Sequence, residues 1–282
     1  MDIIYDIPTV KSKLKFYKNQ NLKIGLVPTM GALHKGHLAL VEKSLEENDI
    51  TCCSIYVNPA QFNNSSDLLK YPRPIENDIQ LLSEIGCHVV FNPNDKEMYP
   101  FQPLIKFDFG HLENVMEGKF RPGHFNGVGI VVSKLFNIIQ PDNAYFGQKD
   151  LQQFLIIRQL VKELSFDLKL NSVQIQRDPD GLAMSSRNVR LNTAQRKVAP
   201  KIYEGLELAK KLLLTGNSIA LTQDEVKAFF NSYPEISLEY FEVVHGETLQ
   251  SLTDFSDYIP VALCIAAFVG DVRLIDNLLL FS

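Results

Sequence analysis

Short apolar segments alternate with helical segments through the first 175 residues, and this alternation restricts the possible fold more than any other feature. Ile50–Val57 is rich in β-branched residues and apolar on both faces, which is typical of a strand buried in a parallel sheet. His37–Asn48 places Leu38, Val41 and Leu45 on one helical face. Similar patterns predict strands at Lys23–Val27, His88–Phe91, Ala144–Phe146 and Leu168–Ile175, and helices at Pro74–Ile85, Gly127–Ile139 and Asp150–Leu164. This order predicts an α/β fold with a doubly wound parallel sheet.

A different pattern follows Arg177, where helices come first and strands then follow one another directly. The expected helices are Thr193–Leu214 and Gln223–Asn231, and the expected strands are Leu238–Val244, Pro260–Val269 and Arg273–Leu280. Helices followed by consecutive strands predict a smaller α+β domain with an antiparallel sheet. We therefore expect two domains, at residues 1–175 and 176–282.

Composition limits the classes of partner. The formal net charge is −5 and the Lys and Arg residues form no basic stripe, so no nucleic acid is expected as a partner. The longest apolar run, Ile259–Val269, is far shorter than a membrane span, and the first residues lack the pattern of a signal peptide. The four cysteines lack metal-ligand spacing, which favours buried free thiols in a reducing compartment. These features predict a cytoplasmic protein without a membrane partner.

Five polar segments contain the candidate functional residues. Ligands of a doubly wound sheet bind at the carboxyl ends of its strands. The first segment, Pro28–His37, joins a strand to a helix N-terminus, which favours phosphate. Gly31 and Gly36 let a ligand approach the backbone closely. His34 and His37 can face the same way and donate hydrogen bonds to phosphate oxygens, although metal ligation and a purely structural role are alternatives.

The second and third segments are also loops that follow or precede expected elements. Val57–Phe62 offers Gln61 for a hydroxyl or a carboxylate and Phe62 as an apolar wall. Phe120–Gly127 brings an arginine, a histidine and glycines to the start of a helix, which suits an anion. The alternatives are an ordinary turn for the second segment and a loop with an exposed arginine for the third.

The fourth and fifth segments carry charged and hydroxyl side chains. In Tyr145–Gln153, Lys149 can reach a phosphate, and Asp150 can cap the following helix or bind ribose or Mg²⁺. In Arg177–Asn188, two serines and Arg187 can clamp a phosphate. The alternatives are a solvated helix start and a polar interdomain loop. Together the five segments predict one cleft for a nucleoside triphosphate, although neither a Walker sequence nor a nucleophile paired with a histidine base is present.

The same segments resemble the motifs of the pantothenate synthetases, also called pantoate–β-alanine ligases. The matching motifs lie between residues 28 and 190 and are Pro-Thr-Met-Gly-Ala-Leu-His-x-Gly-His, Val-Asn-Pro-x-Gln-Phe, Arg-Pro-Gly-His-Phe-x-Gly-Val, Lys-Leu-Phe-Asn-Ile, Pro-Asp-x-Ala-Tyr-Phe-Gly-x-Lys-Asp-x-Gln-Gln and Asp-Gly-Leu-Ala-Met-Ser-Ser-Arg-Asn. Phe241–Val244 and Arg273–Asn277 match more loosely. The resemblance implies the His-x-Gly-His nucleotidyltransferase superfamily, a Rossmann-like domain that binds ATP and pantoate, a C-terminal lid domain and a homodimer.

The resemblance also implies roles for individual residues. ATP binding is implied for Met30, Gly31, Ala32, Leu33, His34, Lys35, Gly36, His37, Gly147, Gln148, Lys149, Asp150, Gln176, Met184, Ser185, Ser186 and Arg187. Substrate binding is implied for Gln61 and Gln153, with Met30, Phe62, Val131 and Val132 around the methyl groups of pantoate. The implied catalytic residues are His37, His34, Lys149, Ser185, Ser186 and Arg187. Mg²⁺ is the implied cofactor, and its ligands stay open.

Two positions depart from the family pattern. Asp178 stands where the family usually has Glu, and Ile130 stands where it usually has Thr. Asp178 lies near the nucleotide loop and Ile130 near the pocket wall, so we expect both to affect affinity more than chemistry.

The implied reaction has two steps. The pantoate carboxylate, which is already ionised at about pH 7, attacks the α-phosphorus of ATP without a general base, and pyrophosphate leaves. The amine of β-alanine then attacks the acyl-adenylate, and AMP leaves. Two alternatives stay open: a nucleotidyltransferase that acts on a phosphorylated substrate, and a nucleotide-binding regulator without catalysis.

Overall fold

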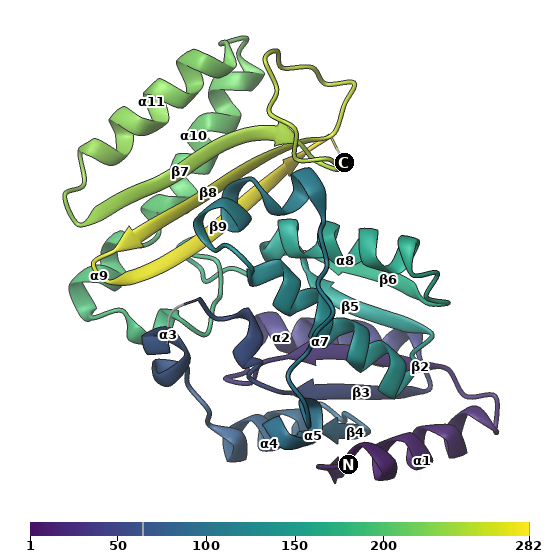
Figure 1. The fold of residues 1–282 in the computed structure, drawn as a ribbon. Helices are drawn as coiled ribbons and strands as arrows, with labels where there is room; N and C mark the ends of the chain where they lie inside the picture. Colours follow the sequence, from purple (N-terminus) through teal and green to yellow (C-terminus); the bar gives the residue numbers. More distant parts are fainter. Residues whose placement is uncertain (64, 282) are drawn as a thin grey trace. The chain divides into compact units, whose positions relative to one another are not determined.

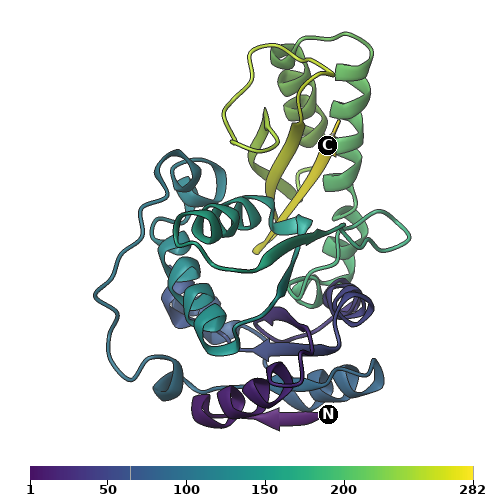
Figure 2. The ribbon, with the colours of Figure 1, turned by 90° about the vertical axis from the view of Figure 1, so that its right-hand side faces the viewer.

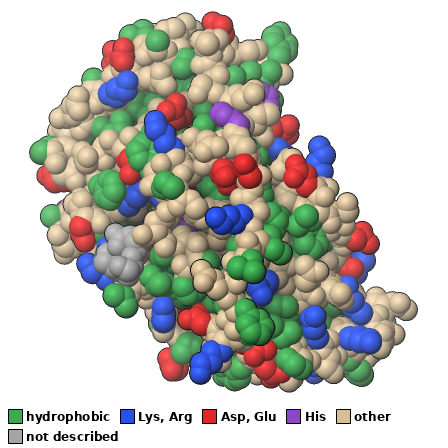
Figure 3. All heavy atoms as spheres, in the orientation of Figure 1, with side chains coloured by type: hydrophobic (Ala, Val, Ile, Leu, Met, Phe, Trp, Pro, Cys, Tyr) green, Lys and Arg blue, Asp and Glu red, His purple; other side chains and the backbone are tan. Residues whose placement is uncertain are grey.

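The protein is described by a computed structural model that covers residues 1–63 and 65–281 of the 282-residue chain. The contacts within the chain divide it into two units. The first unit contains Met1–Gly147 and Gln153–Gln174, and the second contains Gln148–Gln152 and Ile175–Ser282. On the face seen in Figure 3, basic and acidic side chains are interspersed.

A six-stranded parallel sheet forms the first unit (Figure 1). Its strands are β1 (Asp2–Ile4), β2 (Ile24–Thr29), β3 (Ile50–Ile55), β4 (Val89–Phe91), β5 (Asn143–Gly147) and β6 (Lys169–Val173). They lie in the order β1-β4-β3-β2-β5-β6. The chain proceeds from β2 through β3 to β4 and then restarts at β5 on the other side of β2, so the switch point lies between β2 and β5. This topology confirms the predicted doubly wound sheet.

Helices cover both faces of this sheet. The helices and single turns along this part of the chain are α1 (Ile7–Lys18), α2 (Lys35–Glu47), η1 (Pro59–Gln61), α3 (Ser65–Lys70), α4 (Ile75–Glu84), α5 (Asp95–Met98), η2 (Gly110–Glu113), α6 (Met116–Phe120), α7 (His124–Ile139), η3 (Gln148–Asp150) and α8 (Leu151–Glu163). Leu26 of β2 packs in one hydrophobic cluster with α1 and α7, whereas Val27 packs in another with α2 and α4. Because neighbouring strand residues point to opposite faces, these clusters form two core layers.

An antiparallel sheet of three strands forms the second unit. Its elements are η4 (Asn188–Arg190), α9 (Thr193–Val198), α10 (Lys201–Leu214), α11 (Ile219–Asn231), β7 (Ile236–His245), β8 (Val261–Val269) and β9 (Val272–Leu280), with the strand order β7-β8-β9. Leu206 of α10 and Val226 of α11 pack with Leu263 of β8 in a separate core cluster. In Figure 2 the two green helices lie against the yellow strands of this sheet. The predicted α+β arrangement is confirmed.

Several local predictions differ from the structure. The expected helix Thr193–Leu214 is two helices, because Pro200 lacks the backbone N–H that a continuous helix would need. Sequence analysis assigns no element to the first 22 residues, where β1 and α1 lie. β1 pairs with β4, which lies far from it in the sequence, and no local pattern reveals this pairing. The start of α1 is visible in the sequence, since Asp6 caps it and a proline follows in its first turn.

The division into units differs from a single cut at residue 176. Gln148–Gln152 groups with the second unit, because β9 is hydrogen-bonded to this segment through Asn277. The functions expected for the two domains stay predictions. In the part of the chain that the structure describes, none of the helices has the length and apolar character needed to cross a bilayer. Cys52, Cys53 and Cys87 are buried free thiols, as predicted.

Candidate active site

The loop between β2 and α2 follows the strand that borders the switch point. Its residues Gly31 and Ala32 both adopt left-handed conformations, with φ of 78° and 50°. Thr29 Oγ1 accepts a hydrogen bond from Gly31 N at 3.2 Å and donates to the Ser54 carbonyl at 2.8 Å. A non-glycine residue such as Ala32 rarely adopts this conformation, so surrounding contacts must stabilise the loop.

Asp78 of α4 supplies those contacts. Its Oδ2 accepts a hydrogen bond from Ala32 N at 2.8 Å, and its Oδ1 accepts one from Leu33 N at 2.7 Å. Burial raises the pKa of the Asp78 carboxyl, although the two backbone N–H groups oppose this shift. A Cβ on Gly31 would lie 2.9 Å from Asp78 Oδ2, so the turn requires glycine there. Sequence analysis does not predict Asp78, but a signal exists, because a carboxylate is out of place on the apolar face that carries Leu82.

His34 and His37 lie at the start of α2. His34 is the N-cap residue, and its Nδ1 accepts a hydrogen bond from Gly36 N at 3.1 Å. In that arrangement the proton of a neutral His34 ring lies on Nε2. The two ring centroids are 4.0 Å apart, with the ring planes inclined by 42°. The structure therefore brings the two predicted histidines together and also gives His34 a structural role.

Three of the predicted segments meet around Gln61, which is 6% exposed. Gln61 Nε2 lies 3.3 Å from Met30 Sδ, and Gln61 Oε1 accepts a hydrogen bond from Asn58 Nδ2 at 3.0 Å. His124 Nδ1 lies 2.8 Å from the Gln61 carbonyl oxygen. Because a carbonyl oxygen only accepts, this His124 nitrogen carries a proton. Both Met30 and Gln61, which the resemblance assigns to the substrate, are thus part of one contact network.

Asn58 connects η1 to α7. Its Nδ2 donates to the Gly127 carbonyl at 3.1 Å, and its Oδ1 accepts a hydrogen bond from Tyr99 Oη at 2.8 Å. Burial raises the pKa of Tyr99 to about 12, so its phenol stays a donor at neutral pH. A Cβ on Gly127 would lie 2.3 Å from the Ala60 carbonyl oxygen, so the two segments can pack only with glycine at this position. Sequence analysis gives neither Asn58 nor Tyr99 a role.

The remaining predicted substrate residues of the first unit have ordinary packing. Val131 and Val132 of α7 are buried in the core cluster that also contains Leu26. The Phe62 ring lies 5.7 Å from the Tyr71 ring, edge to face. Gln153 is half-buried in α8. Their contact with a substrate stays a prediction.

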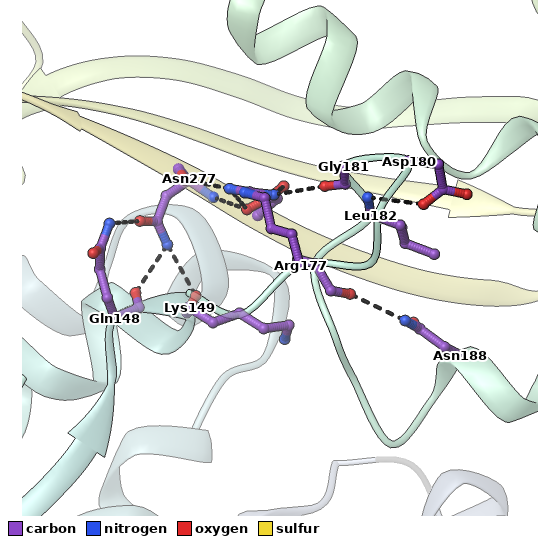
Figure 4. A network of polar contacts seen from close by, with 10 residues as sticks. Gln148, Lys149, Arg177, Asp180, Gly181, Leu182, Asn188 and Asn277 are labelled. Carbon is purple, nitrogen blue, oxygen red and sulfur yellow. Dashed lines mark hydrogen bonds and ion pairs between the residues drawn. The ribbon is translucent and has the colours of Figure 1, made fainter. Parts of the chain in front are cut away.

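In the second unit, the turn that contains Lys149 is attached to β9 (Figure 4). Asn277 Nδ2 donates to the carbonyls of Gln148 and Lys149, at 3.0 Å in each case. Gln148 Nε2 donates in return to Asn277 Oδ1 at 3.2 Å. Asp150, at the end of the turn, is exposed. Lys149 uses only its backbone in these contacts.

The fifth predicted segment begins as a hairpin. Met184 N donates to the Gln176 carbonyl at 2.9 Å. Arg177 NH1 and NH2 donate to Asp276 Oδ2 and Oδ1 at 2.5 Å and 2.9 Å, and the guanidinium lies 3.9 Å from the centre of the Tyr203 ring. Burial raises the pKa of the Asp276 carboxyl, whereas the Arg177 guanidinium lowers it. Sequence analysis places Arg177 in a binding segment, but in the structure its side chain forms contacts within the protein, to Asp276 and Tyr203.

The hairpin continues into the Ser185–Arg187 segment. Arg187 N donates to Ser185 Oγ at 3.2 Å, and Asn188 Nδ2 donates to the Ala183 carbonyl at 3.0 Å. Ser185, Ser186 and Arg187 are half-buried. These contacts fix the backbone of the segment and leave the Ser185 hydroxyl able to donate to a ligand.

The arrangement of the described His, Cys, Asp and Glu side chains does not support a metal site formed by the protein alone. Among the residues that the structure describes, no three His, Cys, Asp or Glu side chains are grouped so that they could hold a metal ion. The alternative in which His34 and His37 bind a metal therefore lacks a third protein ligand within the described chain.

Comparison with known proteins identifies relatives along the whole chain. The family model described as pantoate-beta-alanine ligase matches residues 2–279. A pantothenate synthetase from Cytophaga hutchinsonii is 46% identical over 278 residues, which cover 98% of each chain. One from Bacteroides fragilis is 46% identical over 278 residues, covering 99% of this chain and 98% of the relative.

Solved structures give the same result. The crystal structure of pantothenate synthetase from Thermus thermophilus is 39% identical, covers 99% of both chains and superposes with a TM-score of 0.92. A pantoate-beta-alanine ligase from Francisella tularensis, solved in complex with beta-gamma ATP and beta-alanine, is 37% identical with a TM-score of 0.82, covering 99% of this chain and 97% of that one. These matches confirm the resemblance inferred from the motifs, and the chain belongs to the pantoate-beta-alanine ligase family.

Proposed function

We propose that this chain joins pantoate to β-alanine at the expense of ATP, giving pantothenate, AMP and pyrophosphate through a pantoyl-adenylate. The observation that carries this proposal is the family match over residues 2–279, which spans every motif that the mechanism needs. The Francisella tularensis relative, solved with beta-gamma ATP and beta-alanine, supports the identity of two of the substrates.

In the first unit, the β2–α2 loop is proposed to bind ATP phosphates. The left-handed turn at Gly31 and Ala32 leads directly into the start of α2, where N–H groups and the helix dipole favour anions. His34 and His37 add donors whose rings already lie together. The proposed set in this loop is Met30, Gly31, Ala32, Leu33, His34, Lys35, Gly36 and His37.

In the second unit, a compact ammonium and a clamp of hydroxyls and guanidinium are proposed to act on the triphosphate. Lys149 keeps its side chain outside the network that fixes its backbone. Ser185, Ser186 and Arg187 follow a hairpin that is held by its own hydrogen bonds. We assign the remaining nucleotide contacts to Gly147, Gln148, Asp150, Gln176 and Met184.

Pantoate is proposed to bind through the Gln61 network. The Gln61 side chain can bind a hydroxyl or a carboxylate, and Asn58 and Met30 restrict its orientation. We assign Gln153 to the same substrate, with Met30, Phe62, Val131 and Val132 as apolar neighbours of its methyl groups.

The first step needs positioning and charge stabilisation rather than proton transfer. The attacking carboxylate is already ionised, so the cationic and N–H groups contribute by orienting it and by stabilising charge on the phosphates. In the second step the neutral amine of β-alanine attacks, and exclusion of water protects the mixed anhydride.

Mg²⁺ is proposed to reach the site bound to ATP. Mg²⁺ in nucleotide enzymes keeps several waters and takes ligands from substrate phosphates plus one or two carboxylates. The described residues fit this mode, since they offer no metal cluster of their own. When bound, the ion would neutralise phosphate charge, and Asp150 is the exposed carboxylate of the Lys149 turn that could hold one of its waters.

The reaction is tested by supplying substrates in order. ATP and pantoate alone should release pyrophosphate, and β-alanine added afterwards should yield AMP and pantothenate. Pyrophosphate release without an amide product would indicate a different nucleotidyltransferase. ATP binding without pyrophosphate release would indicate a nucleotide-binding regulator.

The family resemblance also leads us to propose a homodimer in the cytoplasm. Light scattering should give twice the 32.0 kDa mass of one chain. A mass of 32.0 kDa at micromolar concentration would contradict the dimer.

A further inference from the structure

Two segments proposed to bind ATP are attached to the same point of β9. The turn with Gln148 and Lys149 contacts Asn277 (Figure 4), and the hairpin that starts at Gln176 contacts Asp276 through Arg177. Both contacts join positions that lie far apart in the sequence, so neither arises from local structure.

Both polar atoms of the Asn277 side chain have partners in these contacts. Its nitrogen faces two carbonyls, which can only accept, and its oxygen faces the amide nitrogen of Gln148. This arrangement fixes the orientation of the amide, because the reverse orientation would face the Asn277 oxygen with two further oxygens. Asn277 is 2% exposed, so water cannot readily replace the lost partners.

Asp276, the residue before Asn277 in β9, attaches this strand to the hairpin. It is 4% exposed and forms a bidentate pair with Arg177, and its Oδ1 also accepts a hydrogen bond from Asn277 N at 2.7 Å. Arg177 NH2 donates in addition to the Asn277 carbonyl at 3.3 Å. The two neighbouring residues of β9 are therefore linked to each other as well as to the two segments.

We infer that Asn277 is a positioning residue for Lys149, and that it aligns the Lys149 backbone with the hairpin that leads to Ser185, Ser186 and Arg187. The inference rests on the proposed adenylation reaction. Asn277 acts on the backbone of residues 148 and 149, and Figure 4 shows the Lys149 side chain extending away from it. Small errors in the placement of a charged group can lower a rate by about 10²-fold, so a fixed backbone matters here.

The test uses two substitutions and a matched control in the full chain. Asn277→Ala removes the amide, and Asn277→Asp keeps its shape but removes both donors. Val226→Ala also shortens a buried side chain of the second unit, but Val226 lies on α11, and a valine side chain can form no hydrogen bond to either segment. Single-turnover pyrophosphate release with ATP and pantoate should fall by about 10- to 100-fold in both Asn277 variants and stay within about 2-fold in Val226→Ala.

A double-mutant cycle separates positioning from general loosening. Lys149→Ala should lower the rate by about 10²- to 10³-fold in the original chain, but by a factor about 10 to 100 times smaller when Asn277→Ala is already present, because the misplaced ammonium then contributes less. In the Val226→Ala background, Lys149→Ala should lower the rate by the same factor as in the original chain. A full Lys149→Ala cost in the Asn277→Ala background, or unchanged rates in both Asn277 variants, would overturn the inference and leave the proposed reaction intact.

Hydrogen exchange supplies a readout that does not depend on activity. Amides of residues 148–152 should exchange faster in Asn277→Ala than in Val226→Ala. If the original chain releases no pyrophosphate, the proposed reaction fails, and exchange alone then decides whether Asn277 holds the turn. Equal exchange of these amides in Asn277→Ala and Val226→Ala would show that Asn277 does not hold the turn.

Discussion

At the scale of single residues, buried polar side chains hold the backbone of the candidate site. Asp78 holds the turn before α2 through two N–H groups. Asn277 holds the turn that carries Lys149 through two carbonyls. The groups proposed to meet ATP come from sequence motifs, whereas sequence analysis gives Asp78 and Asn277 no positioning role.

Asp78→Asn should weaken the β2–α2 loop. One acceptor oxygen becomes an NH₂ group that faces a backbone N–H, so one hydrogen bond is lost and a buried donor is left unsatisfied. We expect the free energy of unfolding to fall by about 1–3 kcal/mol and pyrophosphate release to slow. Asp142→Asn is the matched control, because Asp142 Oδ2 accepts a bond from Ile24 N at the other end of β2. Equal rates in the two variants would argue against a role for Asp78 in the site.

The raised pKa of Asp78 also predicts a pH dependence. The native pKa lies above the ordinary value of 3.8, so between these two values the native state binds more protons than the unfolded state. The unfolding free energy of the original chain should therefore fall, relative to Asp78→Asn, as pH rises through this interval. Urea titrations at pH values on both sides of 3.8 measure the difference, and a constant difference would contradict the shift.

His37→Ala and Lys149→Ala should each lower the adenylation rate by about 10²- to 10³-fold, the usual loss for one donor that stabilises transition-state charge. Single-turnover pyrophosphate release measures this step without β-alanine. Lys162→Ala, near the end of α8, removes an exposed lysine as a control for net charge. Unchanged rates in both site variants would refute their assignment.

At the scale of elements, close contact between η1 and α7 depends on a glycine, Gly127, which has no side chain. A Cβ on Gly127 would lie 2.3 Å from the Ala60 carbonyl oxygen and 2.7 Å from Gln61 N, so Gly127→Ala must displace backbone. We expect a loss of about 1–3 kcal/mol in unfolding free energy and weaker pantoate binding by calorimetry. Gly129→Ala is the control in the same helix, since its Cβ would meet phenylalanine rings that can shift. Tighter or unchanged pantoate binding in Gly127→Ala would contradict the role of this contact.

At the scale of the whole molecule, each unit has its own hydrophobic core. Leu206 and its neighbours form a cluster made only of residues from the second unit, whereas Leu135 belongs to a cluster of the first. Leu206→Ala should lower stability by about 2–5 kcal/mol and increase hydrogen exchange mainly within the second unit. Leu135→Ala should lower stability by a similar amount but increase hydrogen exchange mainly within the first unit. Equal increases in both units would show that they unfold as one.

The sequence by itself determines the type and order of most elements and the motifs of the site. Continuous apolar runs predict strands at Ile50–Val57 and Pro260–Val269, and the structure has strands at Ile50–Ile55 and Val261–Val269. His34 and His37 lie together, as their spacing predicts, since a helix start brings residues three apart to one side. Pro200 and the cap at Asp6 are local signals of the same kind, because each marks a helix boundary without reference to distant residues.

Only the tertiary structure decided which distant residues hold those motifs in place. The pairing of β1 with β4, the reach of Asp78 to the β2–α2 loop and the attachment of Asn277 to the Lys149 turn each join positions far apart in the chain. A hydrogen bond of this kind depends on where two backbones pass each other, and that placement follows from packing of the whole core rather than from any local pattern. An isolated Asp or Asn in a sequence carries no record of its distant partner.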